Sequence, residues 1–80
     1  MDPRTIRDSV IKPKMIEIFG KAIGNLIFST GILAAMDGRK TEEERFRVMV
    51  ETICKESEVI SLWGEADAQK QKEEWLRLLS

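Results

Sequence analysis

The feature that most constrains the fold of this chain is a run without charged residues, Ala22 to Met36, with small residues along one face. We expect one long helix over residues 13–36. At 100° per residue, its small residues fall within about 60° of one another. They are Gly20, Gly24, Gly31 and Ala35. Each interior glycine costs roughly 0.5–1 kcal/mol relative to alanine, so we expect tight packing against another helix to offset that cost.

The same helix offers more apolar surface than an 80-residue chain can easily cover. Ile23 and Leu26 lie on a face that adjoins the small-residue stripe. From Leu26 onward the helix is apolar nearly all round, which is typical of a helix buried on every side. A domain of this size buries only roughly 60% of its unfolded surface, and it usually needs a disulfide, a metal or oligomerisation. A single cysteine cannot form a disulfide within the chain, and without histidine the chain lacks ligands for a structural metal. Oligomerisation is therefore the remaining source of added stability.

We therefore expect a homodimer whose shared core includes this helix. The residues predicted to form the helix-packing or dimer interface are Gly20, Gly24, Ile27, Phe28, Gly31, Ile32 and Ala35, with further apolar area from Leu33 and Met36. In the alternative, the stripe packs within one chain and the protein is a monomer.

Local signals divide the rest of the chain into helices. Asp2 and Pro3 suit the cap and first position of a short helix, and Pro13 disfavours helical geometry at Lys12, so we expect a break there. A continuous, kinked helix is the alternative. The segment 37–40 reads as a turn with Gly38 in the left-handed conformation. Thr41 and the glutamate three residues later match a capping box.

The predicted fold is all-α, a small bundle of about four helices built on a central long antiparallel hairpin and completed by dimerisation. It forms a single domain over residues 1–80, with helices at about 3–11, 13–36, 42–63 and 65–79. Ser57 interrupts the apolar seam of the third helix, and a separate short helix 58–63 is the alternative reading. Gly64 closes this element in either case.

The composition argues against catalysis. Without histidine or tyrosine, the usual general bases reduce to carboxylates, lysines and Cys54. The three glutamates 42–44 suit a helix start, where they complement the dipole. Cys54 lies beside an apolar seam, which suits a small buried side chain. We therefore expect no enzyme activity, no cofactor and no metal site.

Two further function classes are weaker alternatives. A nucleic-acid-binding regulator would use the basic N-terminal residues Arg4, Arg7, Lys12 and Lys14, although the basic cluster is small for that purpose. A peripheral membrane protein would use residues 22–36. That run is shorter than the roughly 20 apolar residues of a membrane span, so we expect no span.

The favoured function is a non-enzymatic protein–protein interaction module, a small adaptor or regulator that acts through a helical surface. Possible partner contacts are Trp63, Trp75, Leu76 and Leu79, since tryptophan dominates many binding surfaces. Both tryptophans could instead fill the core. The free cysteine and the absence of an apolar signal segment predict a cytoplasmic protein.

Overall fold

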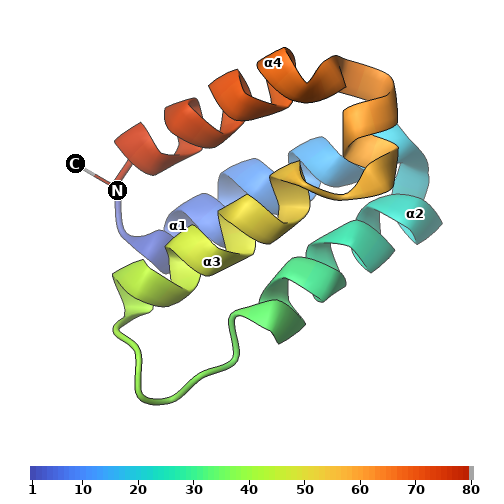
Figure 1. Ribbon diagram of the computed structural model, residues 1–80. Coiled ribbons are helices and arrows are strands. Elements are labelled where there is room, and N and C mark those ends of the chain that lie inside the picture. The colour runs from blue at the N-terminus through green and yellow to red at the C-terminus, as the bar shows by residue number, and fades with distance from the viewer. Residues whose placement is uncertain (80) are drawn as a thin grey trace.

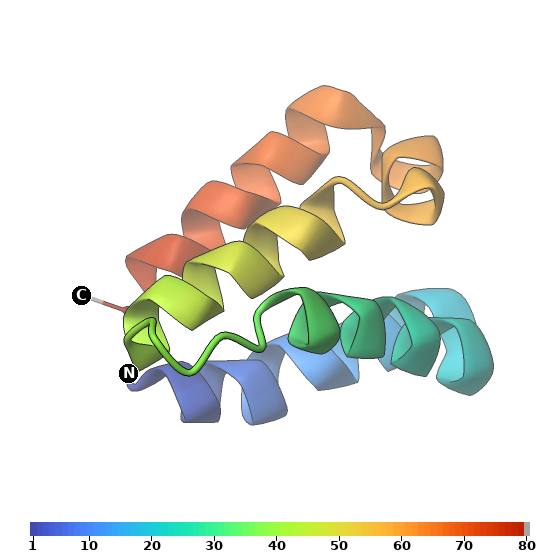
Figure 2. The same ribbon diagram turned by 60° about the horizontal axis from the view of Figure 1, so that its bottom comes forward.

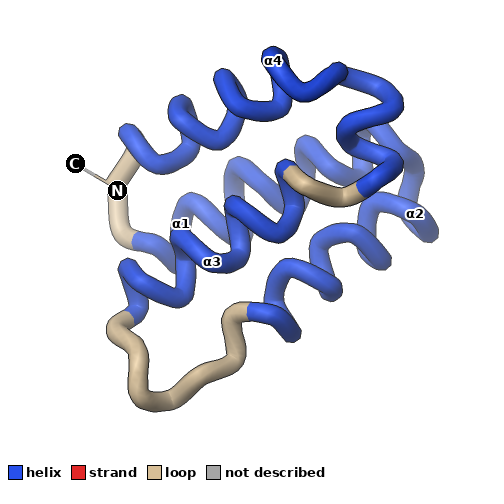
Figure 3. Tube along the Cα trace, viewed as in Figure 1, coloured by secondary structure: helices blue, strands red, loops and turns tan. Residues whose placement is uncertain are grey.

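The computed structural model describes residues 1–79, and within this range it is helical without strands (Figure 1). The elements are α1 (Pro3–Ile6), the π-helical turn η1 (Arg7–Ile11), α2 (Lys12–Ala34), α3 (Glu42–Cys54) and α4 (Ser57–Arg77). The all-α fold class is thus confirmed. The three longer elements are joined by short loops, which Figure 3 shows as the tan parts of the trace.

The break expected at Lys12 is absent, and the alternative of a continuous helix agrees with the structure, because α1, η1 and α2 form one helical segment, Pro3–Ala34. A proline inside a helix lacks an N–H, and its ring crowds the carbonyl four residues earlier. Here the turn before Pro13 is wider than an α-turn: the Lys12 N–H bonds to the Arg7 carbonyl, five residues back. This π-type turn accommodates the proline, so the first two expected helices are one.

Two glycines bend the long segments instead. Gly20 in α2 has φ 84° and ψ 166°, and Gly64 in α4 has φ 79° and ψ 161°, a region that only glycine adopts readily. A Cβ at Gly20 would meet nothing within 4 Å. Gly20 is therefore required for its backbone angles, and no atom of the described chain approaches it closely; its place in a dimer interface stays a prediction.

The two bends share a local sequence pattern and meet in space. Each consists of an aromatic residue, the glycine, a charged residue and an alanine, at residues 19–22 and 63–66. The rings of the two aromatic residues, Phe19 and Trp63, pack with their centroids 6.5 Å apart. The contact holds the bend of α2 against the bend of α4.

The expected helix 42–63 is divided at Lys55 and Glu56, so α3 and α4 are separate and α4 begins at Ser57. This agrees with the alternative reading in which a separate helix starts near Ser57. Helix α2 also ends at Ala34, two residues before the expected end at residue 36. The chain therefore has three helical segments within residues 1–79, and the bend at Gly64 lies at the boundary expected between the third and fourth helices.

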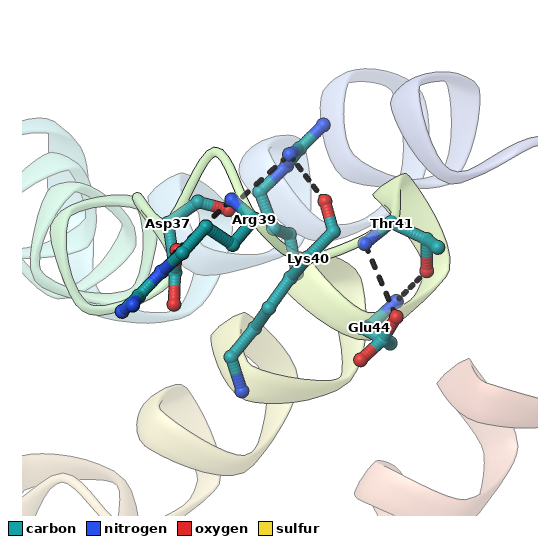
Figure 4. A network of polar contacts seen from close by, with 6 residues as sticks. Asp37, Arg39, Lys40, Thr41 and Glu44 are labelled. Carbon is teal, nitrogen blue, oxygen red and sulfur yellow. Dashed lines mark hydrogen bonds and ion pairs between the residues drawn. The ribbon is translucent and has the colours of Figure 1, made fainter.

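The loop from α2 to α3 is closed by side chains (Figure 4). The capping box is confirmed: the Glu44 N–H donates to Thr41 Oγ1 at 3.1 Å, and the Thr41 N–H donates to Glu44 Oε1 at 3.2 Å. Gly38 does not take a positive φ, so its predicted left-handed role is wrong. The turn is held instead by Asp37 Oδ1, which accepts the Arg39 backbone N–H at 3.0 Å.

Helix α3 is the middle of the structure, with α4 on one side and α1 and α2 on the other (Figure 2). Its apolar residues form the centre of the core, where Val50 and Ile53 have no exposed surface. The two chain ends meet at one end of the bundle, since the Met1 amino group donates to the Leu78 carbonyl at 2.9 Å. This arrangement leaves the second half of α2 at the edge of the molecule.

Candidate interaction surface

The small-residue stripe is largely used inside the chain. A Cβ at Gly24 would lie 2.5 Å from the Met15 carbonyl oxygen, so this glycine lets the two arms of the bent α2 touch. A Cβ at Gly31 would lie 2.8 Å from Ile53 Cγ1, so this glycine lets α2 approach α3. Ala35 is also buried. The close approach that the stripe predicts therefore occurs between helices of one chain.

The apolar residues beside the stripe are also engaged within the chain. Ile27 and Phe28 are buried in the core, and Ile32 is half-buried against it. Each of these residues already contributes to the packing of the single chain. Their assignment to a dimer interface stays a prediction.

The predicted partner contacts near the C-terminus belong mainly to the core. Trp75 is only 2% exposed, and its ring lies 6.4 Å from that of Trp63 in an edge-on arrangement. Trp63 is half-buried, with the Lys14 ammonium 5.7 Å above its ring. Leu76 and Leu79 are partly buried against the same core. Trp75 as a surface contact is therefore wrong, since a partner cannot reach it in the closed fold.

A different set of residues forms the most exposed apolar surface. In and just after the second half of α2, the exposed fraction is 44% for Ile23, 60% for Leu26, 68% for Leu33 and 72% for Met36. We call these four residues the α2 face. In Figures 1 and 2 this half of α2 lies at the edge of the bundle, and no other described helix covers its outer side.

Sequence analysis named these four residues but did not separate them from the buried side of the helix, because it assumed a straight helix. The bend at Gly20 and the docking of Gly24 and Gly31 turn one side of α2 inward, and the opposite side then faces solvent. The available signal was the spacing of Leu26 and Leu33, two turns apart and offset from the glycines. A helix that is apolar all round can bury only one side in so small a bundle.

The α2 face is free of charged groups, and one hydroxyl at its centre is hydrogen-bonded. Thr30 Oγ1 donates to the Leu26 carbonyl at 2.9 Å, so its methyl group can be buried without leaving this donor unpaired. The nearest charged residues are Lys21 before the face and Asp37 after it. Hydrogen bonds from the Arg39 backbone and side chain lower the pKa of Asp37 below its usual value.

Two of the four basic N-terminal residues are paired with acidic groups. Arg4 Nη2 lies 2.9 Å from Glu42 Oε1, and Arg7 Nε lies 2.8 Å from Asp8 Oδ1. Together with Arg45 and apolar residues of α2 and α3, they line a cleft of about 190 Å³. This volume is below the roughly 300–1,000 Å³ of ordinary small-molecule sites. Lys12 and Lys14, the other two basic residues, lie over aromatic rings, at 5.8 Å from the Phe28 centroid and 5.7 Å from the Trp63 centroid.

The segment Pro3–Ala34 is long and apolar enough, by length and composition, to cross a membrane, and 17% of its most apolar window is buried. The bend at Gly20 divides it, however. Residues 21–34 reach only about 21 Å at 1.5 Å per residue, whereas the hydrocarbon core is about 30 Å thick. The arm of α2 after the bend is therefore shorter than the hydrocarbon core is thick.

No group of three or more metal-binding side chains occurs within residues 1–79. Cys54 is the only thiol of the chain, and it is 5% exposed. Burial raises its pKa to about 11, so the thiol stays protonated at neutral pH. A protonated, enclosed thiol is a poor nucleophile.

We expect Cys54 to react with a thiol reagent at pH 8 only after the chain unfolds in urea. Stability should also fall as the pH rises from 9 toward 11, because the unfolded thiol ionises with its ordinary pKa of 9.0 while the folded thiol ionises near 11. Absorbance of the released reagent product measures the first effect, and urea titrations at several pH values measure the second. Rapid labelling of the folded chain would contradict the enclosed position of Cys54.

A comparison with protein-family models finds no match for this chain, and comparisons with curated proteins and with solved structures find none either. The functional argument therefore rests on the α2 face.

Proposed function

We propose that this protein is a non-enzymatic helical interaction module that self-associates through the α2 face. The observation that carries this proposal is the exposure of Leu26, Leu33 and Met36 at 60%, 68% and 72% on one helix. Folded monomers seldom leave large contiguous apolar patches in water, and such patches commonly mark interaction sites. A homodimer would cover the patch of each copy with that of the other.

The expected association is reversible. Burying a leucine, isoleucine or methionine side chain fully stabilises by roughly 1.5–3 kcal/mol, and the α2 face offers four partly exposed ones per copy. Lost translational and rotational freedom opposes association by an estimated 4–15 kcal/mol or more. Because the gain from burial and the cost of lost freedom are similar in size, we expect a dimer that forms only as the protein concentration rises. Such reversible association suits a small regulator or adaptor in a reducing, cytoplasmic setting.

Sedimentation equilibrium of three variants tests the proposal. The wild-type chain should shift from monomer to dimer as its concentration rises toward the millimolar range. Leu26→Lys should remain monomeric, because it places a charge in the centre of the contact. Leu62→Lys is the matched control, since Leu62 is 57% exposed on α4 and lies outside the α2 face.

Circular dichroism must show that both variants retain the helical content of the wild type. A wild-type chain that stays monomeric over the whole range would overturn the proposal. A loss of association in Leu62→Lys, with Leu26→Lys unaffected, would overturn the assignment of the surface.

A further inference from the structure

We propose that the cleft where α1, the end of α2 and the start of α3 meet binds a small monocarboxylate with an apolar chain of roughly six to eight carbon atoms. The proposal goes beyond self-association, because this cleft shares only Met36 with the α2 face. It is carried by the apolar floor of the cleft, by the excess of arginine over carboxylate at its mouth, and by its volume.

The floor of the cleft is apolar and fixed by the core. Its side chains are Ile32 and Ala35, at the end of α2, and Phe46 and Met49 of α3. The last three are between 2% and 7% exposed, so the surrounding core holds them in place. A ligand that lays a carbon chain on this floor removes apolar surface from water without any change in the fold.

The mouth of the cleft carries more positive than negative charge. Arg4, Arg7 and Arg45 line the cleft together with one carboxylate, that of Glu42. Arg4 Nη2 lies 2.9 Å from Glu42 Oε1, and Arg7 donates to both carboxylate oxygens of Asp8, at 2.8 and 3.0 Å. These two ion pairs leave one positive charge, that of Arg45, without an anion at the cleft. A ligand with a single negative charge would balance it.

Arg45 is held in place by uncharged groups. Its Nη1 donates to the Lys40 carbonyl at 2.7 Å and to the Asp37 carbonyl at 3.4 Å, whereas the Asp37 carboxylate is paired with Arg39. Within residues 1–79 Arg45 forms no ion pair, and its hydrogen bonds use Nη1 alone. A guanidinium has five N–H donors in a rigid fork, so those on Nε and Nη2 remain for a ligand carboxylate.

The volume of the cleft, about 190 Å³, sets the size of the ligand. An apolar protein cavity of about 150 Å³ holds benzene, so the cleft has room for roughly six to eight carbon atoms. The carboxylate then lies at the mouth beside Arg45, and the carbon chain lies on the apolar floor.

Titration with sodium hexanoate, followed by the amide shifts in nuclear magnetic resonance spectra, tests the proposal. The wild type should show a single saturable site, with a dissociation constant in the roughly millimolar range expected of so small a ligand. The shifts should centre on Arg45, Phe46 and Met49. Acetate lacks the apolar chain and 1-hexanol lacks the charge, so each should bind at least about tenfold more weakly.

Variants of the arginines test the role of the charge. Arg45→Met keeps a long apolar stem and should weaken hexanoate binding about tenfold or more. Arg47→Met is the matched control, because it makes the same charge change on α3 at an exposed position outside the cleft. If Arg45→Met loses helical content, Arg4→Met replaces it: the Arg4 side chain is 71% exposed, and its loss leaves Glu42 unpaired at the mouth, where it repels a carboxylate.

Several outcomes would overturn the proposal. Shifts that do not saturate, or acetate binding as tightly as hexanoate, would show adventitious anion binding only. Hexanoate binding that is equal in the folded arginine variant and the wild type, or shifts confined to Leu26 and Leu33, would place the ligand outside the cleft. Leu26→Lys should bind hexanoate as the wild type does, so the cleft is tested independently of self-association.

Discussion

Replacing Gly24 with alanine is expected to lower the free energy of unfolding by about 3 kcal/mol, the upper end of the usual cost of overpacking. The added Cβ would lie 2.5 Å from the Met15 carbonyl oxygen and 2.8 Å from the Ile16 Cα, and both are backbone atoms that cannot swing aside. The gain in helix propensity, roughly 0.5–1 kcal/mol, is too small to offset this. A domain of this length has roughly 4–12 kcal/mol in total, so much of its stability would be lost.

Gly38→Ala is the matched control for this prediction. A Cβ at Gly38 meets nothing within 4 Å, and its φ is not positive, so its stability should change by less than about 0.5 kcal/mol. Urea unfolding followed by circular dichroism measures both variants. Equal midpoints for Gly24→Ala and the wild type would show that the arms of α2 do not touch at Gly24.

Replacing Trp75 with alanine is expected to cost about 3–5 kcal/mol, the range for deleting a buried aromatic side chain. Trp75 is 2% exposed and packs edge-on against Trp63, so its removal opens a cavity between α4 and the rest of the core. Trp63 remains as a fluorescent probe of the same region. Its emission should shift to longer wavelength as water enters the cavity.

Leu62→Ala provides the comparison for Trp75→Ala, because it also shortens a large apolar side chain of α4 but at a site that is 57% exposed. It should cost less than about 1 kcal/mol. Chemical denaturation monitored by far-ultraviolet circular dichroism gives both values. A Trp75→Ala protein as stable as Leu62→Ala would mean that α4 is not anchored through its tryptophan.

The helix boundaries show which sequence signals are local and which are not. The capping box of Thr41 and Glu44 was predictable because both partners lie within one turn, and its two hydrogen bonds depend on nothing else in the chain. The effect of Pro13 was not predictable from its neighbours alone. A proline ends a helix unless the preceding turn widens, and here the surrounding core holds residues on both sides, with Ile11 and Met15 fully buried.

The glycines show a second limit of sequence reasoning. Spacing placed Gly20 and Gly24 on one helical face, but the two meet different demands: Gly20 supplies a positive φ, and Gly24 supplies space. Both requirements select glycine, so residue type does not distinguish them. Once Gly20 bends α2, angular positions computed for a straight helix no longer tell which side of residues 21–34 is buried.

The exposed side of α2 could not be predicted for the same reason. The sequence indicates that the second half of α2 is apolar on both sides, and from this the need for a second copy was predicted. Which side faces outward depends on where Gly31 docks, against Ile53 of α3, and that contact joins residues 22 positions apart. Trp75 shows the converse: an apolar residue in a terminal helix is found in the core because α4 folds back across α3.

The most direct test of the central claim, that the α2 face is buried between two copies of this chain, is an isotope-filtered nuclear Overhauser measurement. Equal amounts of labelled and unlabelled protein are mixed at millimolar concentration, and only contacts between different copies are recorded. We predict intermolecular contacts between methyl groups of Leu26 and Leu33, with none from Leu62. Intermolecular contacts confined to Leu62, or no intermolecular contact at all, would contradict the claim.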